Sequence, residues 1–184
     1  MTLLEKNGTF IGSYAPDYEL RGIDDQVHHL ARYLEKFRAV GVVFMCNHCP
    51  DVWLYVDRLK KIQASFHHQG FTLMGINAND ATQYPDDSFD NMKTFAARGG
   101  LNFPYLCDST QDVTRSFGAH RTPHVFLVDR RGIVRYQGGI DDNAQEPEAV
   151  KTHYLWAATS ALLRGKDIKP TSTQVVGAEV KWRK

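Results

Sequence analysis

The chain has 184 residues, of which 42% are hydrophobic and 23% charged, and its formal net charge is +1. This composition is that of an ordinary globular protein, and a chain of this length buries enough surface to fold as one domain without covalent staples. The charge near zero argues against nucleic acid or an anionic membrane as a partner, and no apolar stretch is long enough to span a bilayer.

The cysteine content indicates the redox compartment. There are three cysteines, and an odd and low number does not make a disulfide framework. Two of them, Cys46 and Cys49, are close in sequence, which fits a reducing compartment in which one pair cycles. Residues 1–10 lack the basic and apolar regions of a secretory signal. We therefore expect a cytoplasmic location, although a mature periplasmic chain without its signal has a similar composition.

The first elements that the sequence predicts form a strand–helix–strand unit. Ala39–Met45 is short and apolar on both faces, which indicates a central buried strand. From Pro50 to Gly70, apolar residues recur at helical spacing, which indicates a helix of about four to five turns. Phe71–Ile76 has the pattern of a second buried strand. The three elements together predict a right-handed unit with parallel strands.

Two helices and a short strand are expected after a polar loop. Ser88–Arg98 carries its apolar residues on one face, which predicts a helix. Phe103–Cys107 predicts a short strand, and Pro104 confines it to the edge of a sheet. A further short helix follows, capped by Asp108 or Ser109.

The last third of the chain predicts a hairpin, a helix and an extended tail. His124–Val128 and Ile133–Gln137 are expected as two strands joined by a tight turn. Residues 147–165 begin with proline, end with glycine and carry an apolar stripe, which predicts a helix. The tail lacks helical periodicity and is expected as a strand or an extended wrap. We interpret residues 1–184 as one domain with a core over about residues 8–168 and a C-terminal extension over 169–184.

The sequence Cys46-Asn47-His48-Cys49 lies between the first strand and the first helix. Two cysteines three residues apart at the start of a helix are neighbours on one turn, at a separation that a disulfide tolerates. The pattern favours thiol–disulfide chemistry, because the N-terminus of a helix also promotes the thiolate. Two ordinary core cysteines or half of a zinc site are the alternatives. A structural zinc site needs four ligands, and no second ligand pair follows at the usual spacing.

The order of the elements, with the CxxC motif at the first strand–helix junction, resembles the thioredoxin fold. In more detail, the chain resembles the peroxiredoxin-like (AhpC/TSA, redoxin) branch of the thioredoxin superfamily. Ala15–Leu20 is similar to the entry segment of redoxins, Thr122-Pro123 to the turn whose proline is cis, and the long stretch between the second and third strands to the redoxin insertion. An uncharacterised group of this branch carries the FxCNHCP motif seen at 44–50 and a terminal segment similar to 177–182.

This resemblance covers roughly residues 8 to 183 and implies an α/β fold with a central mixed β-sheet flanked by helices. The sequence departs from the peroxiredoxin pattern PxxxTxxC. With Cys49 as the cysteine of that motif, Val42 stands at the position of the proline and Cys46 at that of the threonine, so the residues that bind peroxide are missing. Relatives often have a cysteine at Ala178 and another just before the Thr-Pro turn. A thiol relay through those positions is absent from this sequence.

The resemblance implies a thiol–disulfide oxidoreductase without a cofactor, which exchanges with a protein disulfide or dithiol and with a cellular thiol reductant. Cys46 is then the exposed nucleophile, and Cys49, one turn into the helix, resolves the mixed disulfide. Asn47-His48 between them tunes the redox potential. Thr122-Pro123 binds the substrate, because it presents backbone groups to a partner chain as a short β-addition.

Two other functions stay open at this point. One is a thiol peroxidase, a peroxiredoxin-like antioxidant that uses Cys46 or Cys49. The other is a metal-binding or chaperone-like protein in which the two cysteines act with His120 or His124. Cys107 is expected as a small packed residue at a strand end, with a role as a third redox thiol as its alternative. The sequence pattern specifies neither the redox direction nor the oligomeric state.

Overall fold

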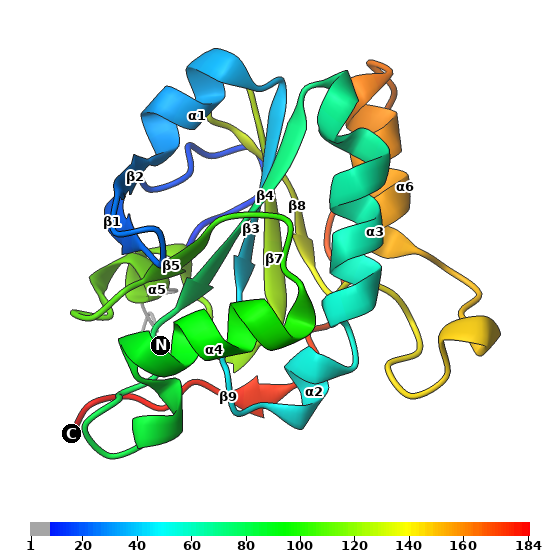
Figure 1. Cartoon of the computed structure of the whole chain (residues 1–184). Coiled ribbons are helices and arrows are strands. Elements are labelled where there is room, and N and C mark those ends of the chain that lie inside the picture. Colours follow the sequence, from blue (N-terminus) through cyan, green and yellow to red (C-terminus); the bar gives the residue numbers. More distant parts are fainter. Residues whose placement is uncertain (1–7) are drawn as a thin grey trace, which may run out of the picture.

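We describe the protein from a computed structural model that covers residues 8–184 (Figure 1). Within this range, seven strands form one mixed sheet with helices on both faces. None of the helices in this range is long and apolar enough to cross a membrane. The inference that residues 1–10 are no secretory signal falls mostly outside the described part of the chain.

The centre of the sheet is the parallel pair that the sequence predicts. Strands β3 (Ala39–Phe44) and β4 (Phe71–Asn77) are parallel, with Ala39 opposite Phe71. Every residue of both strands is buried, as expected for strands that are apolar on both faces. The sheet runs in the order β2-β1-β5-β4-β3-β7-β8.

The helix between these strands is shorter than expected and is divided. Helix α2 (Pro50–Trp53) is followed by α3 (Val56–Phe66) and by a single 3₁₀ turn, η1 (His67–Gln69). The break falls at Tyr55, whose backbone N–H donates to the carbonyl of Val52, three residues back. Gly70 ends the segment with a φ of 91°, which glycine adopts at little cost.

Strand β5 (Tyr105–Cys107) is internal and not at an edge of the sheet, which corrects the prediction. An N-terminal hairpin, β1 (Glu19–Gly22) and β2 (Val27–His29), pairs with its free side, and this hairpin was not predicted. Pro104 does not prevent the pairing, because it lies just before the strand. There its carbonyl accepts from the backbone N–H of Gly75, and no ladder N–H is needed.

The C-terminal hairpin of the sheet agrees with the prediction, whereas the helices around it begin later than expected. Strands β7 (His124–Asp129) and β8 (Val134–Gly138) are antiparallel, and β7 is antiparallel to β3. The remaining helical elements are α1 (Leu30–Lys36), η2 (Pro85–Asp87), α4 (Phe89–Gly99), α5 (Asp112–Phe117), η3 (Pro147–Ala149) and α6 (Tyr154–Leu163). The expected caps of α5 are therefore wrong. Asp108 instead accepts from the backbone and the hydroxyl of Thr114, inside the helix.

Two apolar clusters lie on the two faces of the sheet, which makes three layers (Figure 1). The larger cluster fills the space between the sheet and α2, α3, α4 and α6, and it includes both Cys46 and Cys49. The smaller cluster lies under α1 and α5. The CxxC motif is thus part of the larger core.

The tail passes along the end of the sheet and returns to the motif. It forms β9 (Ala178–Glu179), which pairs antiparallel with β6 (Arg121–Thr122) in a separate two-stranded sheet. This agrees with the expected extended wrap and brings the last segment of the chain beside Thr122-Pro123.

Candidate active site at the Cys46–Cys49 disulfide

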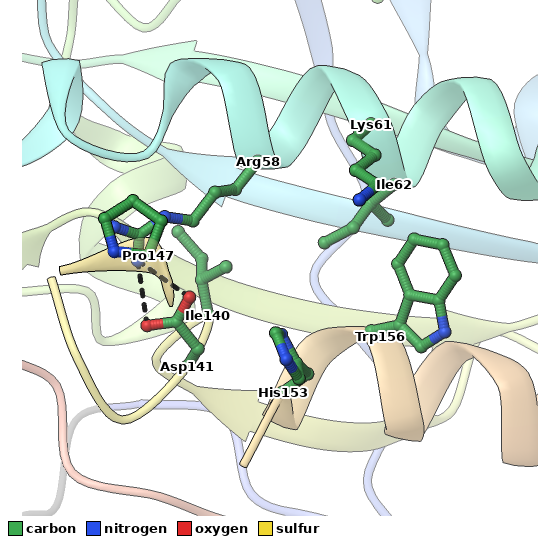
Figure 2. Close-up of a pocket in the computed structure, with 8 residues that line it drawn as sticks. All are labelled: Arg58, Lys61, Ile62, Ile140, Asp141, Pro147, His153 and Trp156. Atoms are coloured by element: carbon green, nitrogen blue, oxygen red, sulfur yellow. Dashed lines mark hydrogen bonds and ion pairs between the residues drawn. The ribbon is translucent and has the colours of Figure 1, made fainter. Parts of the chain in front are cut away.

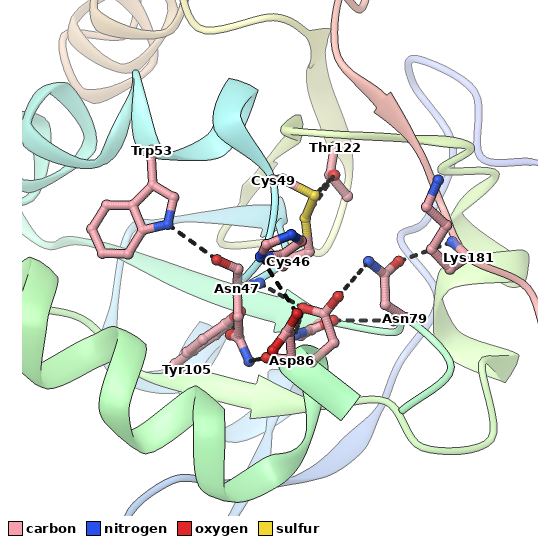
Figure 3. Close-up of a disulfide and its surroundings, with 12 residues drawn as sticks. Cys46, Asn47, Cys49, Trp53, Asn79, Asp86, Tyr105, Thr122 and Lys181 are labelled. Carbon is pink, nitrogen blue, oxygen red and sulfur yellow. Dashed lines mark hydrogen bonds and ion pairs between the residues drawn. A yellow bond between two sulfur atoms is a disulfide. The ribbon is translucent and has the colours of Figure 1, made fainter. Parts of the chain in front are cut away.

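Cys46 and Cys49 form a disulfide with their Cα atoms 5.8 Å apart, within the usual range (Figure 3). Cys49 is the N-cap of α2, and its φ of −123° and ψ of 110° are those of an extended residue. The prediction that it lies one turn into the helix is therefore wrong. The cause is Pro50, which disfavours the helical conformation of the residue before it and so begins the helix itself.

Both sulfurs are buried, which overturns the expectation of an exposed nucleophile. Residue Cys46 is 0% exposed and Cys49 3%. The motif packs into the core between the sheet and the helices, and Ala178 of β9 packs against the same cluster. The disulfide is therefore covered by the chain itself.

The hydroxyl of Thr122 contacts both sulfurs. Its Oγ1 lies 3.3 Å from Sγ of Cys46 and 3.5 Å from Sγ of Cys49. A disulfide carries no S–H, so the hydroxyl is the donor in this state. The residue is buried at the end of β6, and the peptide bond to Pro123 is cis. The Thr-Pro turn and the CxxC motif, which are distant in sequence, thus meet in space.

Asn47 anchors the motif to the segment before α4. Its backbone N–H donates to Oδ1 of Asp87 at 2.7 Å, and its side-chain Oδ1 accepts from the hydroxyl of Tyr105 at 2.7 Å. Its carbonyl accepts from Nε1 of Trp53 at 3.1 Å (Figure 3). Burial, and secondly the charge of Asp87, raise the pKa of Tyr105 well above its usual value, so this phenol stays a donor.

Asp87 is the functional candidate that the sequence did not reveal. This buried carboxylate also accepts from Nδ2 of Asn77 at 3.1 Å and from Nδ2 of Asn79 at 2.9 Å. It therefore holds the end of β4 and the backbone after Cys46 together. In the sequence it is one of two adjacent aspartates in a polar loop, and nothing distinguishes it from the exposed Asp86.

His48 lies at the surface, with 76% of its side chain exposed, and its Nδ1 is 3.7 Å from Oδ2 of Asp86. Water screens so exposed a pair, which limits its effect on the sulfurs. The tuning role of Asn47-His48 stays a prediction, and the contacts of Asn47 show a positioning role in addition.

The two histidines beside the Thr-Pro turn have different surroundings. His124 is buried, and its Nε2 is 2.7 Å from Oε1 of Gln137. Burial lowers its pKa to about 4, so the ring is neutral at physiological pH. His120 is exposed and lies against Trp182. Among residues 8–184, no group of three or more histidine, cysteine or acidic side chains is arranged to hold a metal.

The model of the AhpC/TSA family matches residues 11–137. The chain belongs to the AhpC/TSA family. This AhpC/TSA protein is 29% identical, over 71% of its length and 70% of the relative's, to thiol-disulfide oxidoreductase ResA of Geobacillus thermodenitrificans.

Solved structures of other proteins are similar to this chain. An uncharacterised conserved protein from Geobacillus kaustophilus has a TM-score of 0.89 and 34% identity, with 96% of this chain and 94% of that chain covered. A candidate thiol:disulfide interchange protein DsbE from Chlorobium tepidum has a TM-score of 0.62 and 25% identity, with 71% and 85% covered. The sheet with helices on both faces is thus the thioredoxin-like fold that the sequence predicted.

Cys107, the third thiol of this AhpC/TSA protein, is the last residue of β5 and is free. Burial raises the pKa of its thiol, which disfavours the nucleophilic thiolate. This agrees with the expectation of a packed residue at a strand end and gives no support to a third redox thiol.

A pocket of about 390 Å³ between α3 and α6 shares no residue with the disulfide site (Figure 2). Arg58 lies at one end, and its guanidinium donates to both carboxylate oxygens of Asp141 at 3.0 and 2.8 Å. It also donates to the carbonyls of Asn143 and Ala144. The charge of Arg58 is thus used to hold the loop after β8, so the pocket offers no free guanidinium to a ligand.

Proposed function

We propose that this AhpC/TSA protein is a thiol–disulfide oxidoreductase that cycles Cys46 and Cys49 between dithiol and disulfide against a protein partner. The observation that carries the proposal is the Cys46–Cys49 disulfide. The hydroxyl of Thr122, the last residue of β6, is in contact with both of its sulfurs. The names of the ResA and DsbE relatives support the same chemistry.

The exchange needs only the residues of this site. In the reduced protein, the Cys46 thiolate attacks a partner disulfide, forms a mixed disulfide and releases one partner thiol. Cys49 then attacks the Cys46 sulfur, which releases the second partner thiol and closes the disulfide. The partner gains two electrons, and a cellular thiol reductant returns them to the pair. Thr122 donates to a sulfur throughout and stabilises negative charge on it.

The test is the reduction potential of the pair. The protein is equilibrated with glutathione buffers, and its free thiols are counted by mass. We expect a two-electron couple between about −300 and −120 mV. Cys46→Ser should abolish it, and the matched control Cys107→Ser should leave it unchanged. If no intramolecular disulfide forms over this range, the proposal fails.

Two further variants identify the nucleophile. In Cys49→Ser, Cys46 should accumulate as a stable mixed disulfide with glutathione, because no second thiol releases it. In Cys46→Ser the corresponding adduct on Cys49 should be scarce. The opposite pattern would exchange the two roles.

A thiol peroxidase is the competing function, since the family model that matches is AhpC/TSA. Consumption of hydrogen peroxide separates the two. We expect none above the background of the double variant Cys46→Ser/Cys49→Ser, because Val42 and Cys46 replace the proline and threonine of the peroxidase motif.

A further inference from the structure

The segment Gly177–Val180, which we call the strap, lies along the edge of β6 beside the disulfide. Its β9 pairs antiparallel with β6, with Ala178 opposite Thr122 and Glu179 opposite Arg121. In the next step of the ladder, the backbone N–H of Val180 donates to the carbonyl of His120 at 2.9 Å. The strap therefore uses the strand edge that ends at the residue touching both sulfurs.

Side chains reinforce this pairing. Nη1 of Arg121 donates to the carbonyl of Gly177 at 2.8 Å, and its Nη2 lies 3.5 Å from Oε1 of Glu179. Ala178 packs against the cluster that contains the two cysteines. The Gly177 carbonyl and the Glu179 carboxylate thus both meet Arg121, and the small residue between them lies opposite Thr122.

The pairing of the strap with β6 is short, and further contacts anchor the chain on either side of it. Upstream, Oγ1 of Thr173 accepts from the backbone N–H of Gly139 at 2.9 Å. Downstream, the backbone N–H of Lys181 donates to Oδ1 of Asn79 at 2.9 Å, and its carbonyl accepts from Asp80. The paired part between the ends, β9, has two residues. A two-residue pairing at the edge of a small sheet opens locally at a cost below that of global unfolding.

We propose that the strap occupies the docking edge of the partner protein and that an extended partner segment replaces it. This inference rests on the proposed function and adds the form of the substrate. The partner's reactive cysteine takes the place of Ala178 over the disulfide, and an acidic residue follows it opposite Arg121. Strand addition at a free edge is a common mode of peptide recognition, and here the chain's own tail fills the edge when no partner is bound.

Gly177→Ala tests the strap without truncation. A Cβ at this position would overlap the carbonyl oxygen of Thr122, so the methyl group forces the strap away from β6. Dithiothreitol reduces a disulfide to two thiols and is itself oxidised to a cyclic disulfide. We expect it to reduce Cys46–Cys49 about tenfold faster than in the wild type. This corresponds to about 1.4 kcal/mol in the opening equilibrium. The matched control is Val176→Ala, the preceding exposed residue, which should react at the wild-type rate.

A second variant keeps the test decisive if Gly177→Ala does not fold. Arg121→Ala removes the donor to Gly177 and the partner of Glu179 from an exposed position, and it should accelerate the same reduction about two- to fivefold. Wild-type rates in both folded variants, or in Arg121→Ala alone if the glycine variant is unfolded, would overturn the strap as a cover.

The partner's chemistry is tested with a synthetic peptide. It has the sequence of residues 174–181 with Ala178→Cys, and its thiol is activated as a mixed disulfide with thionitrobenzoate. The reduced protein should reduce this bond to two thiols as Cys46–Cys49 closes. A peptide with lysine at the position of Glu179 should react two- to fivefold more slowly, and Arg121→Glu should reverse this preference. Equal rates would overturn the proposed recognition.

The two proposals fail in different ways. If the wild-type protein exchanges with the peptide and the folded strap variants react with dithiothreitol at the wild-type rate, the strap is refuted and the oxidoreductase stands. If neither the wild type nor Arg121→Glu exchanges with the glutamate peptide or the lysine peptide, the proposed function and the docking part of this inference fail together. The dithiothreitol rates then decide only whether the strap covers the disulfide.

Discussion

Replacing Thr122 by valine should make the disulfide harder to reduce. The substitution keeps the shape of the side chain and removes the hydroxyl that lies 3.3 and 3.5 Å from the two sulfurs. A hydrogen bond to a charged acceptor contributes about 1.5–3 kcal/mol, and a thiolate gains more from it than a neutral disulfide sulfur. Because the reduced state loses this stabilisation, the reduction potential should fall by about 30–60 mV.

Equilibration of Thr122→Val with glutathione buffers, followed by acid quench and mass counting of thiols, measures this change. Thr122→Ser keeps the hydroxyl and should stay within about 10 mV of the wild type. A potential that is unchanged or higher in Thr122→Val, with the serine variant unchanged, would refute the reasoning that this hydroxyl stabilises the thiolate.

Three further predictions concern stability. Asp87→Ala leaves three donors without their acceptor, so urea denaturation should show a loss of about 3–5 kcal/mol, whereas the exposed neighbour Asp86→Ala should change by less than about 1. Asp141→Ala leaves the partly buried Arg58 without its ion pair and should lower the free energy of unfolding by about 3–5 kcal/mol. The control Asp57→Ala, at an exposed position of α3, should lower it by about 0.5 kcal/mol or less. Similar losses in both variants would contradict the ion-pair argument. The folded-state pKa of His124 is lowered to about 4, so below pH 6.5 the unfolded chain binds more protons than the folded protein. The stability that the neutral ring contributes is therefore complete above pH 6.5 and is lost as the pH falls through 4. The stability lost between pH 7 and pH 4 should therefore be smaller in His124→Gln by about 3 kcal/mol, and equal losses in the two proteins would show that this ring does not titrate as described.

The sequence predicted the parts of the fold that have a strong local signal. Ala39–Met45 and Phe71–Ile76 could be identified because strands buried on both faces are continuous apolar runs. The CxxC motif was placed correctly between the first strand and the helix. The extended conformation of Cys49 could also have been inferred, since Pro50 follows it.

The elements that the sequence missed are short and pair with distant partners. Strands β1 and β2 have four and three residues and no clear alternation, yet β1 completes the sheet against β5. Ala178 of the tail packs against the cluster that contains Cys46, more than a hundred residues before it, and no local pattern reports such a contact. Asp87 was missed for a similar reason, because its three donors come from two other segments. The cytoplasmic location stays a prediction.

Because the strap lies near the C-terminus, it is synthesised well after the two cysteines. A ribosome releases Cys46 and Cys49 long before it reaches residues 177–180, and at about 5–20 residues per second this interval lasts on the order of ten seconds. Throughout that time the nascent chain carries both thiols without the segment that later pairs with β6 beside them. Oxidants and glutathione therefore reach the new pair without the cover that we propose for the finished molecule, so we expect the compartment in which the chain is made to set its first redox state.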